Sequence, residues 1–482
     1  MEPFEHGSRI LVAHDMTHPT PPRIDGVPSR TVAAAVAACV CVFGLQAAPA
    51  ASQTHTFGSL DDPSEYNALA WWDTEAGVTA YGGFSLIGPQ WRGATRLAAH
   101  VKRSQASLRI DAAARTGIFG TFEEDFDEWR DAIRIVDFAR WTPRNSATYI
   151  RVGPLDRSRL GVGHLVNFFS TQNAWDTRSA GVEASFGERS VQAQVIVEDL
   201  TRSRLFAGRL AFRPFFAQSS RLSSLWLAGS ALTDRSATGR AGDPLVAWSV
   251  DARMTAFEAG SFSFEPFASV AQIQTMGRGV LVGADLINNN FIDIARLQLR
   301  LALHFNGAAF QPGYFGSLYT VRSRRANLIA DPDATRDGIV LPGDDNEFLA
   351  GVPIEFVFRD NSVWTELRIH FFQRFELWYQ FLRHHGTQDL SEYHLRLFLR
   401  LERLELSIGQ DRAGLDGFFS LFGEAGDENA LVFDFTYNIR GALWARTEAR
   451  YTFVPSGTGP GGREQFVVQR RFEPLLGLRF DF

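Results

Sequence analysis

The feature that most constrains this chain is a strict alternation of apolar and polar side chains along successive short segments. Leu245–Ala256 shows it clearly, because Val246 and Trp248 fall in one phase while Asp251 and Arg253 fall in the other. Successive side chains of a strand point to opposite sides of a sheet. The segment is therefore predicted to be a strand with one apolar and one polar face.

The same alternation recurs in the segments 297–304, 363–371, 393–400, 431–438 and 443–453, with clusters of Gly, Asp, Asn and Pro between many of them. Such clusters indicate turns between strands. Many side chains on the polar faces are fully charged, and most of those are arginines. The ionisable side chains assigned to the polar faces are Asp251, Arg253, Arg300, Glu366, Arg368, His370, Arg396, Arg400, Arg446, Glu448 and Arg450.

A membrane-spanning barrel explains these segments better than a soluble β-sandwich does. Their length matches the roughly 9–11 residues that a tilted strand needs to cross hydrocarbon. Their apolar faces carry Leu, Phe, Tyr and Trp, the side chains that meet lipid and its interfaces. Because all backbone groups in lipid must be paired, the sheet has to close on itself. We therefore predict an all-β chain that forms a single transmembrane antiparallel barrel.

The last strand carries the most specific signal. Leu476, Leu478, Phe480 and Phe482 share one phase, the chain ends on Phe482, and the pattern extends back to Glu464. This segment resembles the closing strand of Gram-negative outer-membrane β-barrels of the porin-like type. The resemblance implies that Phe480 and Phe482 are an assembly signal read by the barrel-assembly machinery. It also implies an outer-membrane location, contact with lipid and lipopolysaccharide, and leaves a homo-oligomer open.

Counting turns backward from Phe482 predicts about 18–22 strands, an even number by expectation. A barrel of this size is too wide for its own side chains to fill. The count puts long connections at the end remote from Phe482 and short ones beside it. The exception is Ser323–Asn346, a long connection that the count places at the Phe482 end, which indicates one miscounted strand between residues 310 and 375.

The first fifty residues are predicted to be a cleaved signal peptide with a long n-region. Thr31–Ala47 is uncharged and Ala48-Pro49-Ala50 offers the small residues of a cleavage site, which implies export through the Sec pathway. Residues 51–75 are expected to form a short periplasmic segment and residues 76–482 the barrel. The only cysteines, Cys39 and Cys41, lie in the signal peptide, so the mature chain has no disulfide or thiolate site.

One internal segment, Leu160–Trp175, does not alternate and is too apolar for a solvated loop. We expect it to fold into the barrel as a constriction loop, with His164 and Asn167 facing the lumen. The alternative is a pair of poorly alternating strands.

An acidic run, Thr121–Arg130, contains a Thr121/Glu124 capping-box pattern that predicts a short helix. The rest of this run is expected to be a solvated loop. Acidic clusters can hold divalent cations, but no spacing here matches a known metal loop, so we predict neither metal nor cofactor. A net charge of −6 argues against nucleic acid as a partner.

These features predict a porin-like outer-membrane channel for passive passage of small hydrophilic solutes, and the arginine-rich lumen favours anionic ones. One alternative is a structural or secretion-associated barrel with an occluded lumen. The other is a barrel hydrolase with His370, His384, His385 and His394 converging near one rim. Neither Gly-x-Ser-x-Gly nor His-Glu-x-x-His occurs, so we do not expect an enzyme.

Overall fold

The computed structural model describes residues 75–482, apart from the gaps at 104, 119, 127–128, 144–147, 174–178, 202–203, 219–220, 236–243, 275–276, 308–309, 323–360, 373, 386–390, 416–428 and 459–463. The predicted signal peptide (1–50) and nearly all of the predicted periplasmic segment (51–75) lie outside the described residues. In the described part, no helix is long and apolar enough to cross a membrane.

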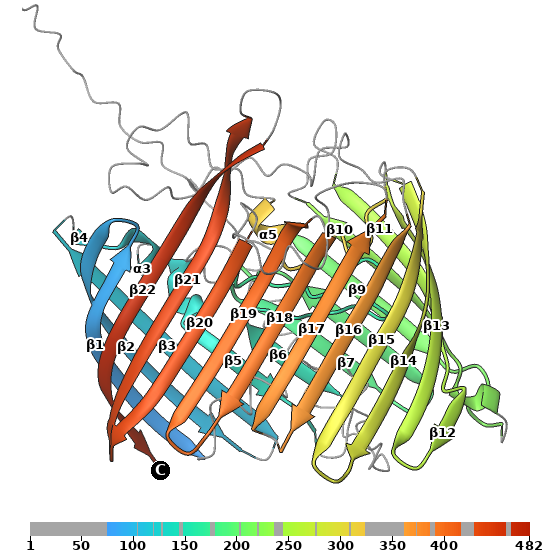
Figure 1. Cartoon of the computed structure of the whole chain (residues 1–482), viewed down its shortest axis with the longest axis horizontal. Coiled ribbons are helices and arrows are strands. Elements are labelled where there is room, and N and C mark those ends of the chain that lie inside the picture. Colours follow the sequence, from blue (N-terminus) through green and yellow to red (C-terminus); the bar gives the residue numbers. More distant parts are fainter. Residues whose placement is uncertain are drawn as a thin grey trace, which may run out of the picture. The chain divides into compact units, whose positions relative to one another are not determined.

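Strands dominate the described chain, and the helices are single short turns (Figure 1). The strands are β1 (Ala76–Ile87), β2 (Gln90–Lys102), β3 (Ala106–Gly117), β4 (Gly120–Thr121), β5 (Val136–Trp141), β6 (Tyr149–Gly153), β7 (Gly181–Gly187), β8 (Val191–Val197), β9 (Leu205–Phe212), β10 (Trp226–Asp234), β11 (Leu245–Arg253), β12 (Phe257–Ala259), β13 (Phe262–Ile273), β14 (Gly277–Phe291), β15 (Ala295–Asn306), β16 (Ser362–Phe371), β17 (Phe375–His384), β18 (Ser391–Arg400), β19 (Leu404–Leu415), β20 (Asn429–Arg440), β21 (Leu443–Thr458) and β22 (Glu464–Asp481). The helices are α3 (Glu123–Phe126), α4 (Trp129–Arg134), α5 (Tyr319–Arg322) and the 3₁₀ turn η2 (Arg221–Ser224).

These strands close into an antiparallel barrel. Each wall strand pairs with its neighbour in the sequence, and β22 closes the ring by pairing with β1, with Phe480 opposite Val78. The short strands β4 and β12 only extend β3 and β13, which leaves twenty wall strands among the described residues. The predicted fold class and strand number are confirmed.

The two ends of the barrel differ. We call the end that carries Phe482 the lower end; there Phe482 N donates to Ala76 O. Strand β15 ends, and β16 begins, at the upper end, because Ser362 pairs with His304. The described strands that flank this connection therefore meet it at the upper end, and residues 323–346, which the count placed at the lower end, lie outside the described residues. The segment 297–304 of the sequence analysis is β15, and β16 is the next wall strand among the described residues.

The predicted alternation of faces is confirmed. Outward apolar side chains such as Leu97, Leu301 and Phe480 are exposed, whereas the charged side chains between them are buried in the interior. In β22 the exposed phase ends on Phe482, which is 76% exposed. An outer apolar surface and a polar interior are the arrangement that hydrocarbon requires of a closed sheet.

The wall is not equally tall all round. Strands β5 to β8 have 6, 5, 7 and 7 residues, whereas β21 and β22 have 16 and 18. The five residues of β6 rise about 17 Å before tilt, at ~3.3 Å per residue. The strand ladder is thus shortest where the chain leaves β6 to enter the interior.

Candidate functional site in the barrel lumen

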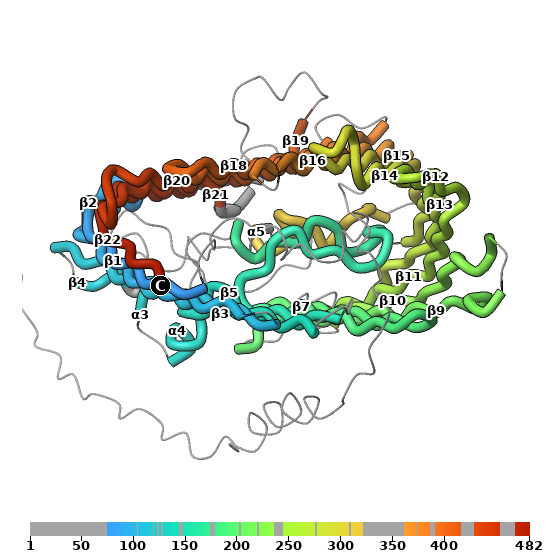
Figure 2. The backbone as a smooth tube through the Cα atoms, turned by 90° about the horizontal axis from the view of Figure 1, so that it is seen from below, coloured from blue at the N-terminus to red at the C-terminus, as the bar shows by residue number. Residues whose placement is uncertain are grey.

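Two segments of the chain fill part of the lumen, and we call them together the plug. They are Leu155–Asn173, between β6 and β7, and Phe310–Val321, after β15. Most of their side chains are buried. Figure 2 shows them side by side inside the ring of strands. The first segment contains the predicted constriction loop, whereas sequence reasoning missed the second.

Backbone hydrogen bonds join the two plug segments. Phe315 N donates to Leu165 O over 3.1 Å, and Gly313 N donates to His164 O over 3.0 Å. A parallel β-bridge pairs Val166 with Phe315. Buried backbone groups need hydrogen-bond partners, and each segment supplies some of those partners to the other. The plug is one structural unit built from distant parts of the sequence.

The plug packs against one half of the barrel wall through an apolar core. Leu165, Phe169 and Phe315 form one cluster with inward side chains of β8 to β13. Val162 extends the apolar packing to Trp364 on β16. Small inward residues make this possible, because alanines such as Ala247 leave room for plug side chains. This half of the lumen is a protein core.

Polar contacts fix the plug in register with the wall. Arg159 NH2 lies 2.5 Å from Glu366 Oε2, and Asn167 Nδ2 donates to Gln380 Oε1 over 3.0 Å. His164 Nδ1 lies 3.1 Å from Ser269 Oγ. Burial lowers the pKa of His164 to about 3, so its ring is neutral near pH 7. His164 and Asn167, which were predicted to face the lumen, thus lie within the plug.

Three of the predicted pore-lining residues face the plug. Arg300 NH1 donates to Val162 O over 3.0 Å, and Glu366 binds Arg159. Asp251 pairs with Arg209 at 2.8 Å, beside the plug backbone at Gly161.

Four others lie among wall residues. Arg253 lies 2.5 Å from Glu265, and Arg368 lies 3.6 Å from Glu376. Arg400 is 4.0 Å from Glu405 near the lower end, where His370 is also buried, opposite Glu376.

The remaining four, Arg396, Arg446, Glu448 and Arg450, line cavities on the other side of the plug. The middle cavity has a volume of about 150 Å³. An upper cavity of about 80 Å³ includes Arg115 and Arg471, and a lower cavity of about 30 Å³ includes Arg479.

The three cavities form a column along β2, β3 and β18 to β22. The upper and middle cavities share Arg96 and Glu448, and the middle and lower cavities share Arg109 and Arg446. We call them the cavity column.

Arginine dominates the lining of the cavity column. Its arginines are Arg96, Arg109, Arg115, Arg134, Arg151, Arg157, Arg396, Arg446, Arg450, Arg471 and Arg479. Its carboxylates are Asp111, Asp137, Asp156, Glu376, Glu405, Asp434 and Glu448. Arginines therefore outnumber carboxylates among the side chains that line the column.

Glu448 is the hub of these charges. Its Oε2 lies 2.5 Å from Arg96 NH1 and 3.2 Å from Arg446 NH2, and its Oε1 lies 2.5 Å from Arg471 NH2 and 2.9 Å from Arg450 Nε. One carboxylate thus holds four guanidinium groups between the upper and middle cavities. Removing one partner from such a buried set leaves uncompensated charge.

One arginine of the middle cavity has side-chain donors without a hydrogen-bond partner among the described residues. The side chain of Arg151 is 1% exposed, and its NH2 donates to Pro154 O over 2.8 Å. Its Nε and NH1 have no hydrogen-bond partner among the described residues, with Glu183 3.9 Å away from NH1. Buried donors of this kind are satisfied when an acceptor enters the cavity.

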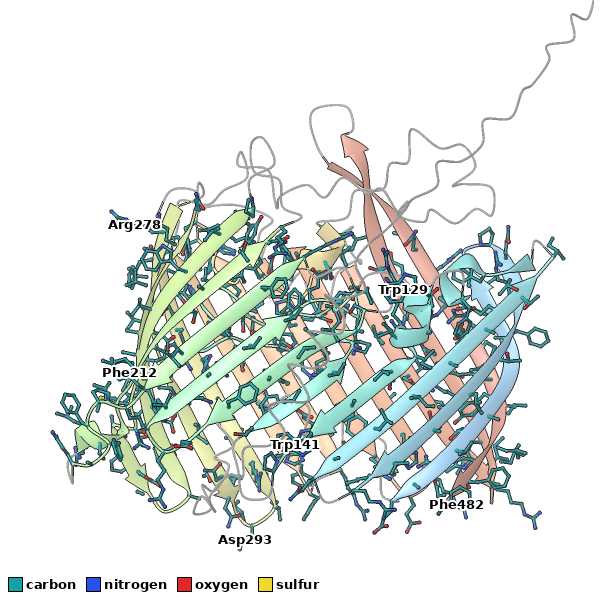
Figure 3. All side chains as sticks on the ribbon, turned by 180° about the vertical axis from the view of Figure 1, so that it is seen from behind. Trp129, Trp141, Phe212, Arg278, Asp293 and Phe482 are labelled. Atoms are coloured by element: carbon teal, nitrogen blue, oxygen red, sulfur yellow. The ribbon has the colours of Figure 1, made fainter. Side chains whose placement is uncertain are left out.

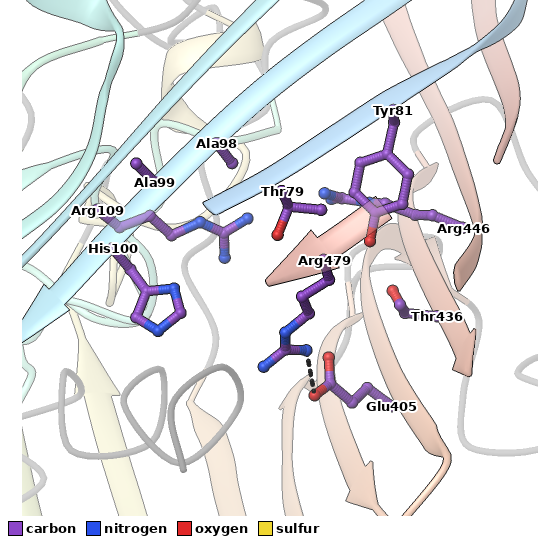
Figure 4. A pocket seen from close by; sticks show the side chains of 10 residues that line it. All are labelled: Thr79, Tyr81, Ala98, Ala99, His100, Arg109, Glu405, Thr436, Arg446 and Arg479. Carbon is purple, nitrogen blue, oxygen red and sulfur yellow. Dashed lines mark hydrogen bonds and ion pairs between the residues drawn. The ribbon is translucent and has the colours of Figure 1, made fainter. Parts of the chain in front are cut away.

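Figure 4 shows the side chains that line the lower cavity. Arg479 NH1 lies 3.3 Å from Glu405 Oε1, and the guanidinium of Arg479 lies 4.9 Å from the ring centre of Trp444. Arg109 and Arg446 are the other arginines of this cavity, and the imidazole of His100 also lines it. Its lining combines these ion-pairing groups with Tyr81 and two threonines.

The sequence contained a signal for several missed lining residues. Arg109, Asp111 and Arg115 alternate with Leu108 and Ile110 along β3, the same pattern that identified the later strands. The plug segment Phe310–Val321 gave no such signal.

The acidic run gives a mixed result. The predicted short helix is confirmed as α3, with α4 following it. The expectation of a solvated loop is wrong for Asp125 and Asp131, which are buried. Arg115 NH1 lies 2.5 Å from Asp125 Oδ1, and Arg134 NH1 lies 3.0 Å from Asp131 Oδ1. Within the described ranges no cluster of His, Cys, Asp and Glu is arranged to hold a metal ion.

The four histidines considered for a hydrolase do not converge. His370 lies at the lower end of β16, whereas His384 lies at the upper end of β17. His394 does meet Asp411 at 2.7 Å and Ser317 at 3.1 Å, but both oxygens contact the same ring nitrogen, Nδ1. A serine nucleophile needs the other nitrogen of a histidine oriented by the carboxylate. This trio is therefore a buried hydrogen-bond network.

Neither a protein-family model nor a curated protein matches the chain. Among solved structures, OccAB3 of Acinetobacter baumannii matches with 11% identity, 85% of this chain and 100% of that chain covered, and a TM-score of 0.32. The outer membrane protein opdK of Pseudomonas aeruginosa matches with 9% identity, 85% and 99% covered, and a TM-score of 0.31. Wzi of Escherichia coli, a carbohydrate-binding β-barrel involved in group 1 capsule assembly, matches with 10% identity, 87% and 86% covered, and a TM-score of 0.33.

Similarity at this level says nothing about solutes or partners, and the fold stands on the strand pairing described above. The chain is an antiparallel β-barrel of twenty wall strands, similar to these outer-membrane β-barrels, with a plugged lumen and an arginine-lined cavity column beside the plug.

Proposed function

We propose that the protein is an outer-membrane channel through which small hydrophilic anions diffuse along the cavity column. The observation that carries this proposal is the column itself, with its excess of arginine over carboxylate. A row of fixed positive charges attracts anions and repels cations, and low-dielectric walls strengthen the field. Passage also needs several weak binding sites in series. Glu448 keeps anion binding weak, because its carboxylate competes with a permeant anion for the arginines.

The test is conductance of the purified barrel in planar lipid bilayers. We expect stable unitary steps and, under a tenfold KCl gradient, a reversal potential displaced toward the chloride equilibrium potential. A cation-selective conductance would contradict the proposed role of the arginines.

A second candidate, a structural or export-associated barrel with an occluded lumen, is favoured by the size of the plug. The apolar core around Phe169 and Phe315 closes the half of the lumen beside β8 to β13. The same experiment separates the two candidates. Electrical silence of a protein that is folded, as judged by heat-modifiable migration, would support the occluded barrel and contradict the channel.

We also propose that Phe480 and Phe482 act as the signal for the barrel-assembly machinery, and that residues 1–50 direct export through the Sec pathway. Deleting Phe482 is expected to lower the amount of heat-modifiable barrel in the outer membrane several-fold. The side chain is exposed, but the deletion also removes the hydrogen bond from Phe482 N to Ala76 O. Phe482→Ala keeps that bond and should lower barrel levels in the same direction if the side chain is recognised. Phe472→Ala, at an exposed aromatic in the same phase of β22, is the control, and normal barrel levels without Phe482 would contradict the assignment.

A further inference from the structure

The strand ladder of the wall is interrupted beside β3. This strand pairs with β2 over Ser107–Thr116, but with β5 only over Ala106–Ile110. Above Ile110, the described residues place no wall strand on that side of β3 until the two pairs made with β4. Helices α3 and α4 stand there instead, and Figure 3 labels Trp129 on α4.

The interruption lies at the level of the outer apolar band. Ala112, at its centre, pairs with Leu97, which is 57% exposed on the outside of β2. Trp91, an exposed aromatic of the kind that marks the membrane interface, lies higher on β2. Backbone groups at such a break need partners, and on β3 Asp111 N donates to Ile135 O and Arg115 N to Asp125 Oδ2.

The helix pair has two chemically different faces. Phe126, Trp129 and Ile133 are exposed, with Trp129 at 65%. Asp125, Asp131 and Arg134 are buried, and Arg134 lines the upper cavity. The helix pair is therefore the partition between lipid on one side and the arginine-rich upper cavity on the other.

The two helices are held to the wall differently. Asp125 of α3 binds the side chain of Arg115 and also accepts from Arg115 N over 2.6 Å. The end of α4 is tied to β3 by Asp111 N, which donates to Ile135 O over 2.7 Å. The edge of β3 between these two ties faces the helix pair without a strand ladder.

We propose that the upper cavity binds the headgroup of an anionic amphiphile, a phosphate or carboxylate that carries an alkyl chain, and that the chain leaves through the interrupted ladder beside α4 into the membrane. The cavity, of about 80 Å³, holds a headgroup and not a chain. Arg134, which also pairs with Asp131, and Arg471, which also pairs with Glu448, supply charge-assisted donors. Trp129 and Ile133 supply apolar contact outside. This inference extends the proposed function, since the cavity belongs to the same column.

The probe is radiolabelled dodecyl phosphate, added to the barrel in phosphatidylcholine nanodiscs, with empty nanodiscs as background. We expect saturable binding above background, weak competition by inorganic phosphate and none by dodecanol. Arg134→Gln should weaken binding about ten-fold, the loss of one hydrogen bond to a charged group. Arg213→Gln is the matched control, because Arg213 lies near the lower end of the barrel and bonds to Ser223 O.

A second variant protects the test from misfolding. Ile133→Glu changes an exposed side chain, so the barrel should remain heat-modifiable. The new carboxylate should disfavour the alkyl chain of the ligand beside α4. We expect it to weaken dodecyl phosphate binding and to leave binding of inorganic phosphate unchanged. Binding no greater than in empty nanodiscs, or equal binding in wild type and both variants, would overturn the proposal. Either result could accompany normal anion conductance, so this inference can fail while the channel stands, and the reverse.

Discussion

Replacing Leu155–Asn173 with a short Gly-Ser linker is expected to raise the unitary conductance of the barrel several-fold. This segment supplies one side of the apolar core that fills the lumen beside β8 to β13. Without it, inward side chains of those strands such as Leu232 and Ile273 would border water, and only Phe310–Val321 of the plug would remain. A barrel of this strand number is too wide to close by its own side chains. Single-channel recording measures the effect directly.

The control carries the same linker in place of residues 459–463, which join β21 to β22. That variant should conduct like the wild type. Heat-modifiable migration establishes that both barrels are closed, because loss of the core costs stability. Unchanged conductance in a folded plug variant would mean that the plug does not limit passage.

Glu448→Gln is expected to give the second large effect, a marked gain in anion selectivity. The substitution keeps the shape of the side chain but removes the negative charge that four arginines share. One unit charge at 4 Å is worth about 4 kcal/mol at an effective dielectric constant of about 20. A permeant anion then replaces the missing charge and binds more tightly. The reversal potential in a KCl gradient should move further toward that of chloride.

The same substitution should lower chloride conductance at low salt, because an ion that binds too tightly leaves slowly. Glu265→Gln is the matched control: Glu265 pairs with Arg253 at 2.5 Å on β13, away from the cavity column. Equal reversal potentials for the wild type and Glu448→Gln would show that ions do not pass between the upper and middle cavities.

Much of the wall could be predicted from the sequence, because each side chain of a wall strand meets either lipid or the interior. The alternation through Val246 and Trp248 is imposed locally, and so is the terminal phase that ends on Phe482. Strand β5 was not recognised, because its 6 residues hold too few alternations.

The interior could not be predicted in the same way. Arg159 and Glu366 are separated by 207 residues, and nothing near either residue indicates the other. The lumenal phase showed that Glu366 and Arg446 face inward, but it could not distinguish a side chain that meets the plug from one that meets a cavity. That distinction depends on Phe310–Val321, which carries no periodic pattern. Sequence reasoning therefore found the inward faces and missed the partition of the interior.

The unequal height of the wall has a consequence for the surrounding lipid. The hydrocarbon of a bilayer is roughly 30 Å thick, more than the short strands from β5 to β8 can match. A bilayer next to a short part of the barrel wall becomes thinner. Acyl chains next to β6 must therefore compress or splay, while those next to β22 stay extended. The resulting elastic stress lies on the side of the barrel that carries α4, so the bilayer around the barrel differs in thickness from one side to the other.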